Sequence, residues 1–115
     1  MKRGEIWTVA GSGDYAGKPR PAVIVQDDSF DGTQSVTICL FTTDTTEAPM
    51  FRLPVPASAE NGLREPCRLM VDKLTTVPRA RLGTRIGRLE DDLLSRLAVS
   101  MLVFLGLAGT ASREV

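Results

Sequence analysis

An arginine held between two prolines is the residue of this sequence best suited to act on a phosphate group. Arg20 follows Pro19 and precedes Pro21, and an apolar run begins at position 22. Each proline fixes its own φ, and Pro21 also restricts Arg20 toward extended conformations. A guanidinium is planar, permanently charged and matched to phosphate oxygens. The motif equally fits a loop end at which the arginine pairs with a carboxylate.

Two further pairs of polar residues stand beside apolar runs. Thr42 and Thr43 directly follow the run 36–41, so their hydroxyls either donate to a phosphate oxygen or cap a turn. Asp72 and Lys73 lie between two apolar segments, where they form either a hairpin salt bridge or a polar site. The glycine-rich stretch 11–17 is not a phosphate-binding P-loop, because the lysine and hydroxyl spacing of that motif is missing.

The composition excludes several kinds of chemistry. The 115 residues include no histidine, which excludes Ser-His-Asp and Cys-His catalysis and the usual zinc sites. Cys39 and Cys67 form no Cys-x-x-Cys pair, and Cys39 lies in an apolar run typical of a buried thiol in a reducing compartment. We therefore expect neither a metal site nor a cofactor.

The charge is balanced overall but unevenly distributed. The formal net charge is zero, which argues against a purely electrostatic hold on nucleic acid. Residues 64–88 nevertheless carry 7 Lys or Arg against 2 Asp or Glu. This basic segment forms either one face of a nucleic-acid groove or a set of solvated strand edges.

Short alternating or apolar segments separated by turn residues predict a mainly β domain of the α+β class. We expect strands at 5–10, 22–26, 36–41, 51–55, 67–71, 75–77 and 85–89. Pro54 suggests either an edge position for its strand or an irregularity in it. Many short antiparallel strands followed by one helix indicate a small barrel-like sheet.

A C-terminal helix is predicted after Glu90. Acidic residues at its start favour the helix dipole, and apolar residues recur at helical spacing up to Leu105, with Gly106 or Gly109 as the stop. Its apolar residues cover more than one stripe, so the helix either forms a subunit interface or is sunk in its own core. We expect a single domain over 1–108 and a frayed tail over 109–115.

The expected location is the cytoplasm. No apolar segment of the secretory type follows the early charges Lys2 and Arg3. The longest apolar stretch, 97–108, is far shorter than the roughly 20 residues that span a bilayer.

Taken in order, these segments resemble the MazF/PemK family of toxins. Residues 3–7 (RGEIW) resemble the family's opening strand, and 17–25 (GKPRPAVIV) resemble its Gly-x-Arg-Pro signature with one residue added. Residues 41–43 (FTT) resemble the strand end that carries its threonine. Residues 69–77 (LMVDKLTTV) resemble the strand pair around its Asp-Gln step. The resemblance covers residues 2–107.

The resemblance implies an SH3-like barrel that forms a homodimer in part through the terminal helix. It implies a toxin that cleaves single-stranded RNA without a metal, and a partner antitoxin whose disordered segment lies across the RNA groove. Arg20 and Thr42 match the family's catalytic pair. Asp72 matches an aspartate that some relatives use as a base, while Met70 stands where their nearby arginine would be.

The expected reaction uses the 2′-hydroxyl of RNA as nucleophile and leaves a 2′,3′-cyclic phosphate and a 5′-hydroxyl. Arg20 is expected to stabilise charge on the phosphorane, and Thr42 to bind a phosphate oxygen. Tyr15, Lys18, Thr43, Asp72 and Lys73 are the further RNA-binding candidates. Tyr15 is the loop aromatic placed to stack on a base.

Two alternatives stay open at this point. One is a non-enzymatic toxin of the same fold that resembles CcdB and binds DNA gyrase. The other is a family member without activity that only binds RNA or an antitoxin. The Pro-Arg-Pro and Phe-Thr-Thr elements favour the nuclease, because a gyrase-binding protein needs no such pair.

Overall fold

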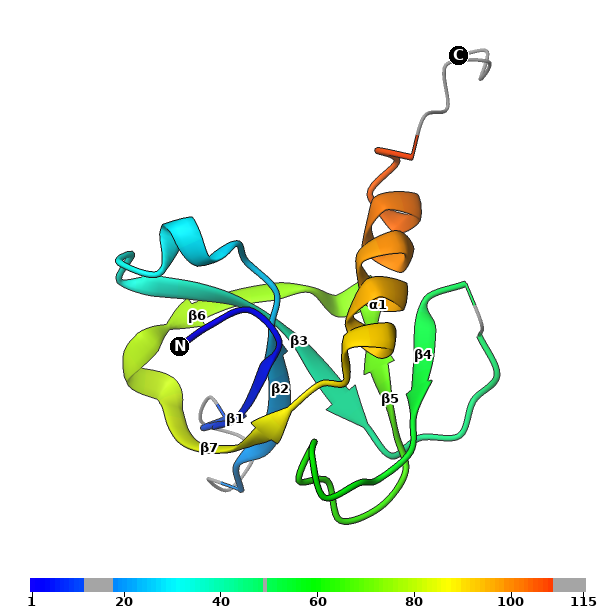
Figure 1. Ribbon diagram of the computed structural model, residues 1–115, viewed down its shortest axis with the longest axis horizontal. Coiled ribbons are helices and arrows are strands. Elements are labelled where there is room, and N and C mark those ends of the chain that lie inside the picture. Colours follow the sequence, from blue (N-terminus) through cyan, green and yellow to red (C-terminus); the bar gives the residue numbers. More distant parts are fainter. Residues whose placement is uncertain (12–17, 49, 109–115) are drawn as a thin grey trace.

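A computed structural model describes residues 1–11, 18–48 and 50–108 of the chain. These residues form seven strands, three short 3-10 turns and one α-helix (Figure 1). The strands are β1 (Glu5–Val9), β2 (Arg20–Ile24), β3 (Ser35–Thr42), β4 (Arg52–Val55), β5 (Cys67–Met70), β6 (Thr75–Pro78) and β7 (Leu82–Arg88). The 3-10 turns are η2 (Asp28–Phe30), η3 (Val71–Lys73) and η4 (Arg79–Arg81), and the helix is α1 (Asp91–Phe104).

The long strand β3 organises an antiparallel sheet. The strand order is β4-β5-β3-β2-β1-β7, and β6 also pairs with β3. One edge of β3 is bound by β2, whereas its other edge is shared between β5 and β6. The turn η3 joins β5 to β6 at the point where β3 changes partner. Segments far apart in sequence therefore meet along a single strand.

Successive residues of β3 point to opposite faces and serve two separate apolar cores. Cys39 and Phe41 belong to the core that α1 covers through Leu93 and Leu97. Ile38 belongs to a second core formed on the other face, and Leu40 packs against it. The face of β3 that carries Ile38 and Leu40 is thus turned away from the helix.

The predicted fold class is confirmed, with one difference in closure. Among the described residues, the end strands β4 and β7 are not paired with each other, so the sheet curls without closing into a barrel. Pro54 lies in the terminal strand β4, as its inability to donate a ladder hydrogen bond predicts. The last strand begins at Leu82, three residues earlier than expected, and the polar segment 27–33 contains η2.

The helix α1 packs on the sheet mainly through its first half, and Met101 is a partly buried contact from its second half. Leu93 and Leu97 are buried, whereas six apolar side chains in the second half of α1 and just beyond it are 45–66% exposed: Val99, Leu102, Val103, Phe104, Leu105 and Leu107. Figure 1 shows this second half of α1 rising beyond the sheet. The hypothesis of a helix sunk in its own core is therefore wrong. No helix of the described residues is long and apolar enough to cross a membrane.

The helix ends at Phe104, and Gly106, one of the two predicted stops, lies just beyond it. This glycine has φ +73°, and the N–H groups of Gly106 and Leu107 donate to the carbonyls of Val103 and Leu102. This pair of bonds satisfies the last helical carbonyls with a left-handed residue just beyond the helix. The expected frayed tail, 109–115, lies outside the described residues.

A buried asparagine holds the β4–β5 loop against the start of α1. The Asn61 side chain is fully buried, and its Oδ1 accepts hydrogen bonds from the N–H groups of Ser58 and Leu63, each at 3.0 Å. Its Nδ2 donates to the carbonyl of Pro56 at 2.9 Å and to Glu90 at 3.2 Å. Every polar atom of the buried amide is thus engaged, which fixes the loop.

The β4–β5 loop also packs closely against β7 at Gly62, and Gly106 provides a matched control for that contact. Both have φ near +72°, but a Cβ on Gly62 would lie 2.0 Å from the carbonyl oxygen of Ile86, whereas one on Gly106 meets no described atom within 4 Å. Gly106→Ala should cost only the left-handed backbone strain, about 1–2 kcal/mol. Gly62→Ala should lower the free energy of unfolding by a further ~1–3 kcal/mol, because the new methyl group would overlap with the backbone of Ile86. Urea unfolding at one protein concentration measures both, and equal midpoints would contradict the packing described.

The two cysteines should differ in reactivity. Burial, aided by the negative charge of Asp72, raises the pKa of Cys39 to about 12. Burial also raises the pKa of Cys67, but that side chain retains some exposure. Because the thiolate is the reactive form, iodoacetamide at pH 8 should label Cys67 first and Cys39 only after unfolding. Peptide mapping by mass spectrometry reads the order, and equal rates in the native protein would refute a buried Cys39.

Candidate active site

The strand register directs Arg20 and Thr42 toward the same end of one sheet face. In the β2–β3 ladder Ala22 pairs with Leu40 and Ile24 pairs with Ile38. Extending this antiparallel register by two residues brings Arg20 level with Thr42, on the same face as those pairs. Opposed side chains on one face have Cβ atoms about 4.5–5.5 Å apart. The two residues singled out from sequence are therefore neighbours across two strands.

Arg20 and Thr42 line a cavity of about 430 Å³, which we call the arginine cavity. Its apolar floor includes Ile38 and Leu40, the residues of β3 that face away from α1. Its charged lining consists of four basic side chains and one carboxylate: Arg20, Arg52, Lys73, Arg81 and Asp44. A chain with zero net charge thus concentrates positive charge around the Arg20–Thr42 pair, as an anionic ligand requires.

The Thr42 hydroxyl is oriented by the turn that follows it. Its oxygen accepts a hydrogen bond from the N–H of Asp44 at 3.2 Å. Because this bond uses a lone pair of the hydroxyl oxygen, the hydroxyl proton remains available for donation. The two sequence interpretations of Thr42, turn cap and phosphate donor, are therefore compatible.

The carboxylate of Asp44 accepts hydrogen bonds in the same turn, which favours its ionised form. Its Oδ1 accepts from the N–H and the hydroxyl of Thr46, at 2.9 and 2.8 Å. These hydrogen bonds from Thr46 hold the pKa of the exposed Asp44 carboxyl below its ordinary value, with help from the charges of Arg52 and Arg68. Asp44 was not identified from sequence, because a loop aspartate resembles any turn former.

Arg52 was also missed, and it binds the predicted Asp72. Its Nε and Nη2 donate to the two carboxylate oxygens of Asp72 at 3.0 and 3.3 Å, with both side chains largely buried. In the β4–β5 ladder Arg52 stands directly opposite Met70. The arginine that the family resemblance places near Asp72 is thus supplied by the neighbouring strand. Only the pairing of β4 with β5, which sequence does not show, could have revealed it.

The other predicted RNA-binding residues are dispersed. Lys73 lines the arginine cavity, whereas the exposed Lys18 does not. Thr43 lines a second cavity of about 240 Å³ that shares Thr42 and Asp44 with the first. We call it the proline pocket, since Pro54, Pro56 and Pro66 form much of its wall. Tyr15 lies outside the described residues.

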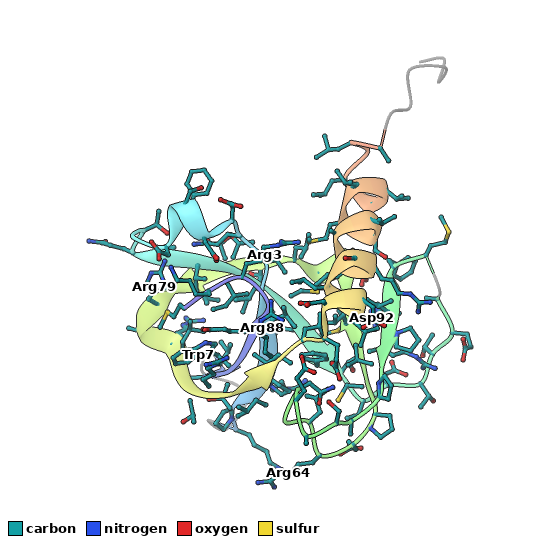
Figure 2. All side chains as sticks on the ribbon, viewed as in Figure 1. Arg3, Trp7, Arg64, Arg79, Arg88 and Asp92 are labelled. Atoms are coloured by element: carbon teal, nitrogen blue, oxygen red, sulfur yellow. The ribbon has the colours of Figure 1, made fainter. Side chains whose placement is uncertain are left out.

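Most charges of the basic segment 64–88 serve the fold. Arg85 and Arg88 pair with Glu5 and Asp91, and Arg79 donates to the carbonyl of Thr33. Figure 2 shows Arg64 pointing away from the sheet. Within the described chain, Lys73 and Arg81 are the only charged side chains of this segment that line the arginine cavity. The segment is thus mainly a set of paired or solvated strand edges.

Comparison with known proteins identifies the family of the chain. Residues 2–104 match the family described as PemK-like, MazF-like toxin of type II toxin-antitoxin system. Over 109 residues the chain is 50% identical to a probable endoribonuclease MazF of Mycolicibacterium smegmatis, covering 95% of this chain and all of that protein.

Solved structures extend the similarity to the fold. The toxin MazF-mt6 of Mycobacterium tuberculosis superposes with a TM-score of 0.71 at 27% identity, over 88% of this chain and 97% of that one. A mycobacterial endoribonuclease in complex with its cognate antitoxin gives 0.75 at 18% identity, over 93% and 96% of the two chains. The chain belongs to the PemK-like, MazF-like toxins of type II toxin–antitoxin systems.

Proposed function

We propose that this toxin is a metal-independent endoribonuclease that cleaves single-stranded RNA at preferred sequences in the cytoplasm. The observation that carries the proposal is that Arg20 and Thr42 line one cavity, whose charged side chains are four cations and one carboxylate. The relationship to a probable endoribonuclease at 50% identity supports the same activity.

In the proposed reaction the 2′-oxygen of RNA forms a bond to the adjacent phosphorus while the bond from phosphorus to the 5′-oxygen breaks. The 2′-hydroxyl loses its proton and the departing 5′-oxygen gains one, which leaves a 2′,3′-cyclic phosphate and a 5′-hydroxyl. Arg20 stabilises the negative charge that builds on the phosphorane. A guanidinium holds its proton too strongly to act as a general base. Thr42 donates its hydroxyl proton to a phosphate oxygen and holds the phosphate in line.

Asp72 acts in this scheme through Arg52 and not as a base. Both of its carboxylate oxygens accept from the guanidinium of Arg52, which leaves them poorly placed to take a proton from the 2′-hydroxyl. The bidentate pair fixes the plane of Arg52 in the cavity wall. Arg52, Lys73 and Arg81 then attract the phosphates that flank the scissile one.

The exposed half of α1 is the proposed homodimer interface. Val99, Leu102, Val103, Phe104, Leu105 and Leu107 are exposed apolar side chains on this segment. A contiguous apolar surface of this kind marks an interaction site. A second copy offers the same surface, and a self-complementary interface follows from two-fold symmetry. A cognate antitoxin is the further partner, and we assign it the RNA-binding face.

Arg20→Ala should abolish cleavage while folding and oligomeric state stay unchanged. The variant removes the group that stabilises the phosphorane, so we expect a loss of at least about a hundredfold, as for other electrostatic transition-state donors. Arg85→Ala is the matched control, because it removes an equal charge from β7 outside the cavity. The assay maps fragment ends from a long single-stranded RNA in EDTA.

Three results would count against the proposal. Cleavage by Arg20→Ala at the wild-type rate would remove Arg20 from the mechanism. Loss of cleavage in EDTA that returns with a divalent cation would contradict metal independence. Intact RNA with the wild-type protein, on several sequences at high concentration, would contradict the ribonuclease assignment itself.

A charge placed on the exposed half of α1 should prevent dimerisation. Phe104→Glu buries a carboxylate in the proposed interface, which is unfavourable without a partner charge. Phe30→Glu is the matched control, because Phe30 is 59% exposed on η2, which Figure 1 shows away from α1. Sedimentation should give a monomer for the first variant and a dimer for the second. A dimer of unchanged stability in Phe104→Glu would exclude this surface.

A further inference from the structure

The proline pocket adjoins the proposed phosphate site and differs from it in chemistry. The two cavities share Thr42 and Asp44, so a group bound in one lies next to a group bound in the other. The arginine cavity contains four cations, whereas the proline pocket contains three proline rings and one cation, Arg68. A phosphate is matched to the first lining and a flat, weakly polar ring to the second.

The loop over the proline pocket is fixed in place. Arg68 donates to the carbonyls of Asp44 and Thr46 at 3.3 and 3.4 Å, and it forms an ion pair with Glu47 at 3.1 Å. Arg68 lies on β5, so its hydrogen bonds and ion pair connect the loop after β3 to the sheet. These contacts restrain the loop that carries Thr43 and Asp44 in the unliganded protein.

Asp44 offers one oriented acceptor at the boundary of the two cavities. Its Oδ1 is held by the N–H and hydroxyl of Thr46. Within the part of the chain that the structure describes, Oδ2 accepts no hydrogen bond. This oxygen is suited to an amino group, which cytosine, adenine and guanine carry and uracil lacks.

We propose that the proline pocket binds the nucleobase next to the scissile phosphate and that Asp44 accepts a hydrogen bond from an amino group of that base. The proposal rests on the ribonuclease function proposed above and deepens it. The base stacks on the proline walls, and single-strand recognition by splayed bases read on their edges is the common mode for RNA. Asp44 is thereby a specificity-determining residue for one position beside the cut.

Asp44→Asn should change the preferred base and not merely the rate. The N–H of Thr46 needs an acceptor, so the new amide keeps its oxygen at the position of Oδ1 and presents its NH₂ group where Oδ2 was. A donor in that place favours a carbonyl oxygen, such as O4 of uracil. At one position flanking the cut, preference for uracil should rise about tenfold relative to adenine, which carries an amino group and no carbonyl oxygen.

Asp27→Asn is the matched control. Asp27 makes the same turn, accepting from the N–H and hydroxyl of Ser29, but it lies before η2 and outside both cavities. Its cleavage profile should equal that of the wild-type protein. Thr43→Val, which removes a hydroxyl from the pocket wall while keeping its shape, should alter the frequency at the same position as Asp44→Asn.

The experiment cleaves a random-sequence single-stranded RNA pool in EDTA and sequences the fragment ends for all four proteins. A changed base frequency at one flanking position in Asp44→Asn, absent in Asp27→Asn, supports the proposal. Wild-type cleavage with an identical profile in Asp44→Asn overturns it, and weaker antitoxin binding by that variant would then assign the pocket to the protein partner. No cleavage by the wild-type protein overturns the ribonuclease function, and the subsite with it.

Discussion

The pairing of β3 on both of its edges is the constraint on which the rest of the structure depends. β2 binds one edge, and the continuous run β5-η3-β6 follows the other. The alternation of β3 then divides its side chains between the core under α1 and the arginine cavity. Thr42 ends β3 and Arg20 begins β2, so the pairing of these two strands brings both members of the proposed catalytic pair to one cavity.

The cavity concentrates positive charge in a neutral protein by drawing its cations from separate elements. Arg20, Arg52, Lys73 and Arg81 come from β2, β4, η3 and η4. Asp72 and Asp44 lie among them and reduce mutual repulsion, and Asp72 also fixes the plane of Arg52. Net charge was therefore a poor guide to the ligand, because local arrangement decides the field at the site.

The Arg20–Thr42 pair was predicted from the family resemblance, whereas local sequence signals predicted the strands, the helix and two candidate glycines for its end. These features depend on alternation, on proline restriction and on glycine at a helix terminus, all of which act over a few residues. Arg52 and Asp44 escaped prediction because their roles depend on the pairing of β4 with β5 and on a turn held by Arg68. The open edge of the sheet was not predicted for a similar reason, because barrel closure depends on whether the end strands β4 and β7 pair with each other. The half-exposed helix was left undecided because apolar spacing does not distinguish its own core from an interface.

The most direct test of the account is a substrate with a single 2′-deoxy substitution at the nucleotide 5′ to a mapped cut. If Arg20 and Thr42 stabilise an attack by the 2′-oxygen, this RNA binds as well as the all-ribose substrate and resists cleavage at that bond in EDTA. Cleavage of the substituted bond at the rate of the all-ribose RNA would show that another nucleophile acts. The proposed role of the Arg20–Thr42 pair would then be contradicted.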